Sequence, residues 1–255
     1  MDWNLRTDDA RPITVTALNR GTLLSELEEA MRQGRGFSVA TLNLDHVVKL
    51  RLHPDFLEAY AAHTHVTADG NPIVWLSHLA GQADVELIPG SELVAPVVAA
   101  AARVGASVAL VGGTEASLAE AATALEQQYE HLRIVLCHAP PMGFDPTGSE
   151  ADRAIAALAE SGAQVVFLAL GAPRQEQFAA YAQGQLPQCG FLSVGAGLDF
   201  IAGTQKRAPV WVRRLSAEWL WRMLRDPGRL AARYAACFAI LPRLTGRAAA
   251  IRRAR

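Results

Sequence analysis

The stretch ASVALVGGTEASLAEAATALEQQYEHLRIVLC, residues 106–137, decides the fold class of this chain. It contains two short apolar runs, ASVALVGG (106–113) and LRIVLC (132–137). Between them lies TEASLAEAATALEQQYE, which has helical spacing behind an N-capping threonine. Two apolar strands separated by a helix are typical of parallel strands joined by a crossover connection. The stretch therefore predicts a strand–helix–strand unit.

The same alternation extends to both sides of this unit. Further apolar runs that suit buried strands are FSVATLN (37–43), HVTAD (65–69), AQVVFLALG (163–171) and FLSVGAG (191–197). Stretches with helical spacing, such as TLLSELEEAMRQG, lie between such runs. This order predicts an α/β fold with a doubly wound, mostly parallel sheet.

Small and polar residues follow these runs, where ligands of open parallel sheets bind. They are Thr41, Asn43 and Asp45; Asp69, Gly70 and Asn71; Gly112, Gly113 and Thr114; Gly171 to Glu176; and Gly195, Gly197 and Asp199. Pro173 suits the first position of a helix, which would place Gln175 and Glu176 in a first turn that attracts anions. Gly112 and Gly113 predict a second anion-accepting turn, and two such turns suit a diphosphate.

The familiar nucleotide-binding motifs are missing from the sequence. GAGLDF (195–200) has Phe200 where a third glycine belongs, and GTQKRA does not fit a Walker A motif. These absences disfavour nicotinamide-dependent and P-loop enzymes. The sequence also has no DxD pair to hold a divalent metal, so an arginine or a helix end would have to neutralise a leaving diphosphate.

Asp69 has two possible roles at this stage. A carboxylate between a strand and Gly-Asn-Pro would lie at the sheet edge, where it could accept a hydroxyl proton. Asp-Gly-Asn-Pro is also ordinary turn chemistry, so Asp69 could form an Asx turn or cap a helix. Thr41 and Asn43 likewise could simply cap the helix that follows them.

Charge is divided unevenly along the chain. Residues 207–255 hold twelve arginines and two acids, a net charge of +10, so residues 1–206 carry −11. If the break at Asp226-Pro227 is only a kink or a helix restart, four arginines share one helical face beside tryptophans: Arg222, Arg225, Arg229 and Arg233. This composition suits an interfacial membrane helix or a phosphate site, as well as a merely solvated face. A nucleic-acid partner is disfavoured because the body is acidic.

Composition restricts the remaining possibilities. The chain has 255 residues, 51% of them hydrophobic, which predicts one large α/β domain (1–206) and a helical appendage (207–255). No apolar run reaches the roughly 20 residues that a membrane span needs. The first residues resemble no signal or transit peptide, so we expect a cytoplasmic protein. Three cysteines without CxxC spacing argue against disulfides and zinc.

Six motifs follow one another along the chain: TLNLDHV, TADGNPIV, ALVGG, LGAPRQEQF, VGAGLDFIAGTQKRAPVW and AEWLWRMLRDPGRL. In this order they resemble the WecG/TagA/CpsF family of bacterial glycosyltransferases. The resemblance covers roughly residues 12–234. It implies a Rossmann-like body whose C-terminal appendage completes the active site and brings the enzyme to the inner face of the cell membrane.

The resemblance also implies a reaction. It is the inverting transfer of a sugar from a UDP-sugar to a polyprenyl-diphosphate-linked saccharide in cell-surface polysaccharide synthesis, without an obligatory metal or other cofactor. Asp69 would be the general base. The substrate-binding residues would be Thr41, Asn43, Gly112, Gly113, Gly171, Gln175, Glu176, Asp199, Arg207, Arg222, Arg229 and Arg233.

Two departures from the family pattern concern the pocket. Arg174 stands where lysine is common, and Glu92 where aspartate is usual, so the donor sugar stays open. Two other classes also stay open: a nicotinamide-dependent oxidoreductase, and a non-catalytic module that binds membranes or phosphates. An apolar face on the appendage would allow self-association, which makes a homo-oligomer a further hypothesis.

Overall fold

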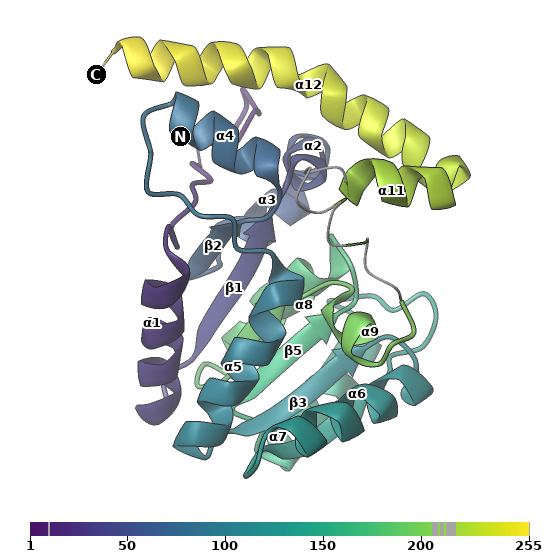
Figure 1. Cartoon of the computed structure of the whole chain (residues 1–255). Coiled ribbons are helices and arrows are strands. Elements are labelled where there is room, and N and C mark those ends of the chain that lie inside the picture. Colours follow the sequence, from purple (N-terminus) through teal and green to yellow (C-terminus); the bar gives the residue numbers. More distant parts are fainter. Residues whose placement is uncertain (10, 206–208, 210–211, 213–217, 255) are drawn as a thin grey trace.

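A computed structural model describes residues 1–9, 11–205, 209, 212 and 218–254 (Figure 1). Its six strands form one parallel sheet in the order β2-β1-β6-β5-β3-β4. The strands are β1 (Phe37–Leu42), β2 (His65–Ala68), β3 (Ser107–Gly112), β4 (Arg133–His138), β5 (Val165–Ala169) and β6 (Gly190–Ser193). Each predicted apolar run overlaps one of these strands, so the predicted fold class is confirmed.

Helices cover both faces of the sheet. One core joins the sheet to α1 (Arg20–Arg32), α5 (Gly90–Val104), α6 (Glu115–Gln128) and α9 (Gly197–Ile201). A second core joins the opposite face to α7 (Ser149–Ser161) and α8 (Arg174–Gln185). Val108 and Leu110 belong to the first core, whereas Ala109 and Val111 belong to the second. Because successive side chains point to opposite faces, strands buried on both sides are apolar throughout.

A third core lies where β1 and β2 end. It includes residues of α2 (Leu44–Leu52), α3 (Pro54–Ala61) and α4 (Asn71–Leu79). It also includes residues of α12 (Pro227–Arg253) and of the segment before α1, residues 1–9 and 11–15, called the N-terminal segment below.

The neighbouring strands β3 and β5 form the switch point of the sheet. The chain leaves β3 into α6 on one face and leaves β5 into α8 on the other. Diverging connections open a crevice outside the carboxyl ends of the two strands, where ligands of such sheets bind. Gly112 ends β3 and Gly171 follows β5, so two of the candidate residues border this crevice.

The C-terminal region contains α11 (Glu218–Arg225) and α12 (Pro227–Arg253). The chain therefore restarts a helix at Asp226-Pro227. Figure 1 shows α12 in yellow across α2 and α4, and its Ile240, Leu244 and Ala248 are buried in the third core. No helix within the described ranges is long and apolar enough to cross a membrane.

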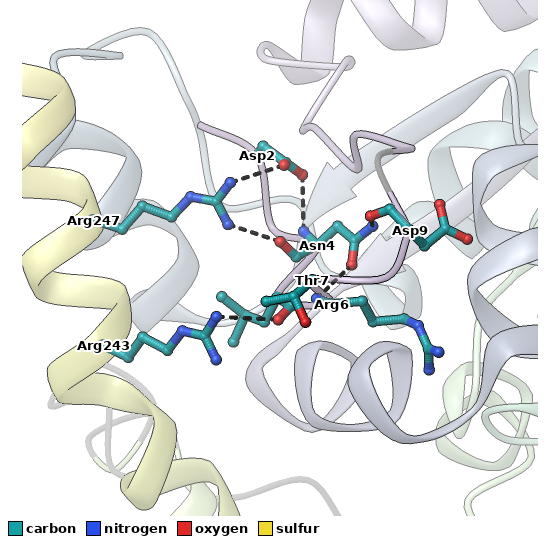
Figure 2. Close-up of a pocket in the computed structure, with 8 residues that line it drawn as sticks. Asp2, Asn4, Arg6, Thr7, Asp9, Arg243 and Arg247 are labelled. Atoms are coloured by element: carbon teal, nitrogen blue, oxygen red, sulfur yellow. Dashed lines mark hydrogen bonds and ion pairs between the residues drawn. The ribbon is translucent and has the colours of Figure 1, made fainter.

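The N-terminal segment forms hydrogen bonds and an ion pair with the C-terminal half of α12 (Figure 2). Arg247 pairs with Asp2 at 2.9 Å and donates to the Asn4 carbonyl at 2.7 Å. Arg243 donates to the Leu5 carbonyl at 3.2 Å. Trp3 and Leu5 of the same segment are buried in the third core with α12.

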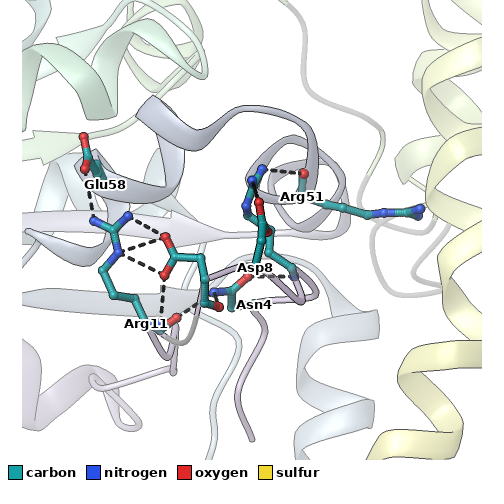
Figure 3. A network of polar contacts seen from close by, with 7 residues as sticks. Asn4, Asp8, Arg11, Arg51 and Glu58 are labelled. Carbon is teal, nitrogen blue, oxygen red and sulfur yellow. Dashed lines mark hydrogen bonds and ion pairs between the residues drawn. The ribbon is translucent and has the colours of Figure 1, made fainter.

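A second polar network joins the N-terminal segment to the body (Figure 3). Arg11 pairs with Glu58 of α3 at 3.3 Å, and Arg6 donates to the Arg51 carbonyl of α2 at 3.1 Å. The segment thus connects α12 with α2 and α3.

Candidate active site

Asp69 and Thr41 meet at the carboxyl ends of two neighbouring strands. Thr41 pairs in register with Thr67, and the Asp69 amide donates to the Leu42 carbonyl at 2.7 Å. The Thr41 hydroxyl lies 3.4 Å from the Asp69 carboxylate and donates to it. Gly70, with φ of +107°, occupies the N-cap position of α4, so helix capping does not account for Asp69.

Asn43 has the local role that the sequence left open. It is the N-cap of α2, and its side-chain oxygen accepts from the His46 amide at 3.0 Å. Thr41 is buried at the end of β1 and caps no helix, because the N-cap of α2 is Asn43. The capping interpretation therefore holds for Asn43 and fails for Thr41.

Glycines let the backbone come close together at the β3–β5 crevice. Gly112 has φ of +116°, and a Cβ atom there would lie 2.5 Å from the carbonyl carbon of Ala169. Gly113 has φ of +67°, and a Cβ atom there would lie 2.8 Å from the Ser117 hydroxyl oxygen and 3.8 Å from a carboxylate oxygen of Asp199. These backbone conformations and approaches exclude ordinary side chains. Gly112, Gly113 and Asp199 therefore share one site.

Asp199 borders this site from α9. Its Oδ2 accepts from the Gln205 side chain at 2.7 Å. Burial raises the pKa of Asp199 above its ordinary value, while the hydrogen bond from Gln205 lowers it. Thr114, next to Gly113, caps α6 together with Ser117, and the Thr114 amide donates to the Ser117 hydroxyl at 3.0 Å. One amide of this predicted anion turn is therefore already bonded.

Gln175 and Glu176 lie in the first turn of α8, as expected, but both are buried. Gln175 is 3% exposed and Glu176 is 0% exposed. Gln175 donates to Glu176 at 2.8 Å and accepts from the Gly195 amide at 3.2 Å. These bonds tie the loop after β5 to the loop after β6.

The second carboxylate oxygen of Glu176, Oε2, has no hydrogen-bond partner among the described residues. Burial raises the pKa of Glu176 to about 7, although Gln175 and Lys49 lower it. Burial raises the pKa of Tyr60 well above its ordinary value, and the charges of Glu176 and Asp69 add to this effect.

The C-terminal arginines are only partly described. Arg207 lies outside the described residues, and so do the side chains of Arg222 and Arg229. Arg233 lies in α12 and pairs with Asp45 of α2 at 2.9 Å.

Lys49 is a site residue that the sequence reasoning missed. It pairs with Asp45 at 2.8 Å and donates to the Ala172 carbonyl at 2.9 Å. Its spacing of four residues from Asp45 on a helix was the available signal.

The first turn of α5 completes the sheet edge. A Cβ atom on Gly90 would lie 2.7 Å from the Ser193 carbonyl oxygen and 3.1 Å from the Thr41 side chain. Glu92, one of the departures from the family pattern, pairs with Arg20 at 2.8 Å. The absence of a side chain at Gly90 therefore allows the start of α5 to lie close to β1 and β6.

The arrangement combines a carboxylate beside a hydroxyl with a glycine-lined crevice. Such a carboxylate can accept a proton from a bound hydroxyl, and glycines let a ligand come close to the backbone. Within the part of the chain that the structure describes, no three His, Cys, Asp or Glu side chains form a group that could hold a metal ion.

Comparison with known proteins gives a consistent result. The model of the glycosyl transferase WecG/TagA/CpsF family matches residues 10–254. Relatives from Staphylococcus aureus strains MW2 and NCTC 8325 / PS 47 are 28% identical over 192 residues, which cover 75% of this chain and 73% of theirs. Both are named N-acetylglucosaminyldiphosphoundecaprenol N-acetyl-beta-D-mannosaminyltransferase. With a match over nearly its whole length, the chain is an enzyme that belongs to the WecG/TagA/CpsF family of glycosyltransferases.

Proposed function

We propose that this enzyme transfers a hexose-type sugar from a UDP-sugar to a polyprenyl-diphosphate-linked saccharide, with inversion, in exopolysaccharide or other cell-surface polysaccharide synthesis. The Staphylococcus aureus relatives support the acceptor class, since their name specifies a diphosphoundecaprenol-linked sugar. The observation that carries the chemistry is the Thr41–Asp69 pair at the sheet edge.

Asp69 acts as the general base in this proposal. Its carboxylate takes the proton of the acceptor hydroxyl while the hydroxyl oxygen attacks the anomeric carbon. The bond from that carbon to the UDP oxygen breaks, and attack from the opposite side inverts the configuration. Thr41 donates to the carboxylate and so holds it in place before the acceptor arrives.

The nucleotide occupies the crevice between β3 and β5. Gly112, Gly113 and Gly171 let its phosphates approach the backbone, and Asp199 borders the same site. Gln175 and Glu176, in the first turn of α8, are assigned to the nucleotide sugar; both are buried, and Gln175 also accepts from the Gly195 amide of the neighbouring loop. Asn43, which caps α2, lies beside Thr41 and borders the donor pocket.

The leaving UDP is neutralised by arginines and by helix ends instead of a metal ion. Arg207, Arg222 and Arg229 are the arginines that we assign to the phosphates of the donor or of the lipid. Preorganised cations of this kind stabilise a developing diphosphate charge in the transition state.

The enzyme binds peripherally to the cytoplasmic face of an anionic membrane, where its lipid-linked acceptor lies. Exposed apolar side chains of the two C-terminal helices support this location, among them Trp219 and Leu224 of α11 and Phe238 of α12. Flotation with anionic and with neutral vesicles tests this part, and equal recovery in both would contradict it. Light scattering with and without vesicles tests self-association.

Asp69→Asn tests the proposed base. Without a proton acceptor, turnover should fall about 10²- to 10⁴-fold, while UDP affinity stays unchanged. UDP release is measured with a lipid-linked acceptor, and UDP affinity by calorimetry. A variant with a near wild-type rate would remove Asp69 from the role.

The donor is identified by thermal unfolding with UDP, several UDP-sugars and NAD. A ligand at about 100 times its Kd stabilises by about 2.7 kcal/mol, which shifts the midpoint measurably. Stabilisation by UDP and one UDP-sugar, but not by NAD, is the expected result. A shift with NAD alone would favour the oxidoreductase hypothesis instead.

A further inference from the structure

A chain of polar contacts connects α12 with the loop between β5 and α8. Arg233 of α12 pairs with Asp45 of α2 at 2.9 Å, and the same Asp45 oxygen pairs with Lys49 at 2.8 Å. Lys49 then donates to the carbonyl of Ala172 at 2.9 Å. The contacts thus lead from the C-terminal helix to the loop that follows β5.

Asp45 is the centre of this chain and is largely removed from water. Its side chain is 10% exposed, against 36% for Arg233 and 25% for Lys49. A largely buried carboxylate needs neighbouring cations to compensate its charge. Removal of one of these cations leaves the carboxylate incompletely compensated. Arg233 and Lys49 therefore share one anion, and each affects the position of the other.

The loop held by Lys49 belongs to the glycine-lined site. The Gln175 amide donates to the Gly171 carbonyl at 3.2 Å, and the Gln175 side chain accepts from the Gly195 amide at 3.2 Å. A displacement of Ala172 would therefore shift both Gly171 and Gly195. The loops after β5 and β6 are expected to move together.

We propose that Arg233 is a positioning residue, which acts through Asp45 and Lys49 to hold the loop between β5 and α8 in its nucleotide-binding conformation. The nucleotide part of this proposal rests on the function proposed above. Arg233 then serves the donor site without touching a phosphate, in contrast to the role expected from the sequence. A change in the packing of α12 against α2 should therefore change the conformation of the donor site.

The first test follows the loop itself and needs no ligand. Hydrogen–deuterium exchange is measured on peptides covering residues 170–178, whose Gln175 and Gln177 amides are hydrogen-bonded. Arg233→Gln and Asp45→Asn should each speed exchange there several-fold, and the double variant should be no faster than the faster single variant. Arg233→Lys keeps the charge and should restore most of the protection.

Arg247→Gln is the matched control. Arg247 lies on the same helix, about 21 Å along it from Arg233. Its pair with Asp2 has the same length of 2.9 Å, and the two arginine side chains are 35% and 36% exposed. This variant should leave exchange at 170–178 unchanged. Equal acceleration in the control and in Arg233→Gln would overturn the proposal, because it would show general loosening of α12.

The second test measures UDP affinity by calorimetry. Loss of the coupling should raise the Kd of UDP about five- to tenfold in both Arg233→Gln and Asp45→Asn, without additivity in the double variant. A direct phosphate contact predicts a different result: Arg233→Gln would weaken binding, whereas Asp45→Asn would not, and this would refute the positioning role.

The two tests separate this proposal from the proposed donor. If wild-type protein binds no UDP, the donor assignment fails, and the exchange comparison still decides whether Arg233 holds the loop. If Asp45→Asn does not fold, Arg233→Gln and Arg233→Lys alone decide whether Arg233 holds the loop. Unchanged exchange at residues 170–178 in Arg233→Gln would then contradict the proposal.

Discussion

Replacement of Glu176 by glutamine should stabilise the protein at neutral and alkaline pH. Glu176 is 0% exposed, and its Oε2 has no hydrogen-bond partner among the described residues. Burial raises the pKa of its carboxyl group to about 7 from an ordinary value of 4.5. The folded protein therefore keeps a proton on Glu176 that the unfolded chain has already released between these two pH values.

The sign and the size of the effect follow from this difference. Since the folded state holds the extra proton, the free energy of unfolding decreases as pH rises from about 4.5 to about 7. One pKa unit corresponds to about 1.4 kcal/mol, so the ionised carboxylate costs about 3 kcal/mol at pH 8. The amide that replaces it in Glu176→Gln carries no charge and keeps an oxygen to accept from Gln175, so most of this cost should disappear.

The assay is urea unfolding of wild type and Glu176→Gln between pH 4.5 and 8. The gap between the two free energies should be about 3 kcal/mol at pH 8 and should shrink toward pH 4.5. Glu120→Gln, on the exposed side of α6, is the control and should show no such gap. Parallel curves for wild type and Glu176→Gln would refute the reasoning, because they would show that Glu176 titrates normally in the folded state.

Three further predictions concern packing, backbone and metal. Leu244→Ala should cost about 2–5 kcal/mol of unfolding free energy, since Leu244 is fully buried in α12, whereas Leu224→Ala, at a side chain 72% exposed, should change it by less than about 0.5 kcal/mol in urea unfolding. Gly112→Ala combines a positive φ with a clash against Ala169, so it should destabilise more than Gly143→Ala, where φ is +83° and nothing lies within 4 Å; equal losses in thermal unfolding would refute the clash. EDTA should leave the calorimetric Kd of UDP and the transfer rate unchanged, and restoration of a lost rate by Mg²⁺ would contradict the proposed neutralisation by arginine.

The sequence determined the sheet and the edge where the site lies. Strands covered by helices on both faces form nearly continuous apolar runs, so runs such as 106–113 and 163–171 were recognisable without any long-range information. The small and polar residues after those runs had to meet at one edge, because parallel strands all end on the same side. Local periodicity is enough for both inferences.

The order of the strands was not readable from local pattern. It is the tertiary pairing of β3 with β5 that brings Gly112 beside Ala169, and the pairing of β1 with β2 that brings Thr41 beside Asp69. Local sequence also left Asp69 divided between an Asx turn, a helix cap and a base. The cap position proved to belong to Gly70, which only the backbone path could show.

Individual side-chain roles depended on how the helices pack. Helical spacing placed Glu176 in the first turn of α8, but only the packing of α8 decided that its side chain is fully buried. Charge pattern placed Arg233 on an arginine face, but its partner Asp45 lies far away in the sequence and meets it only because α12 crosses α2. Hydrophobic periodicity depends only on residues that are close together in the sequence. The ion-pair partner of a buried carboxylate depends on which side chains the tertiary structure places next to it.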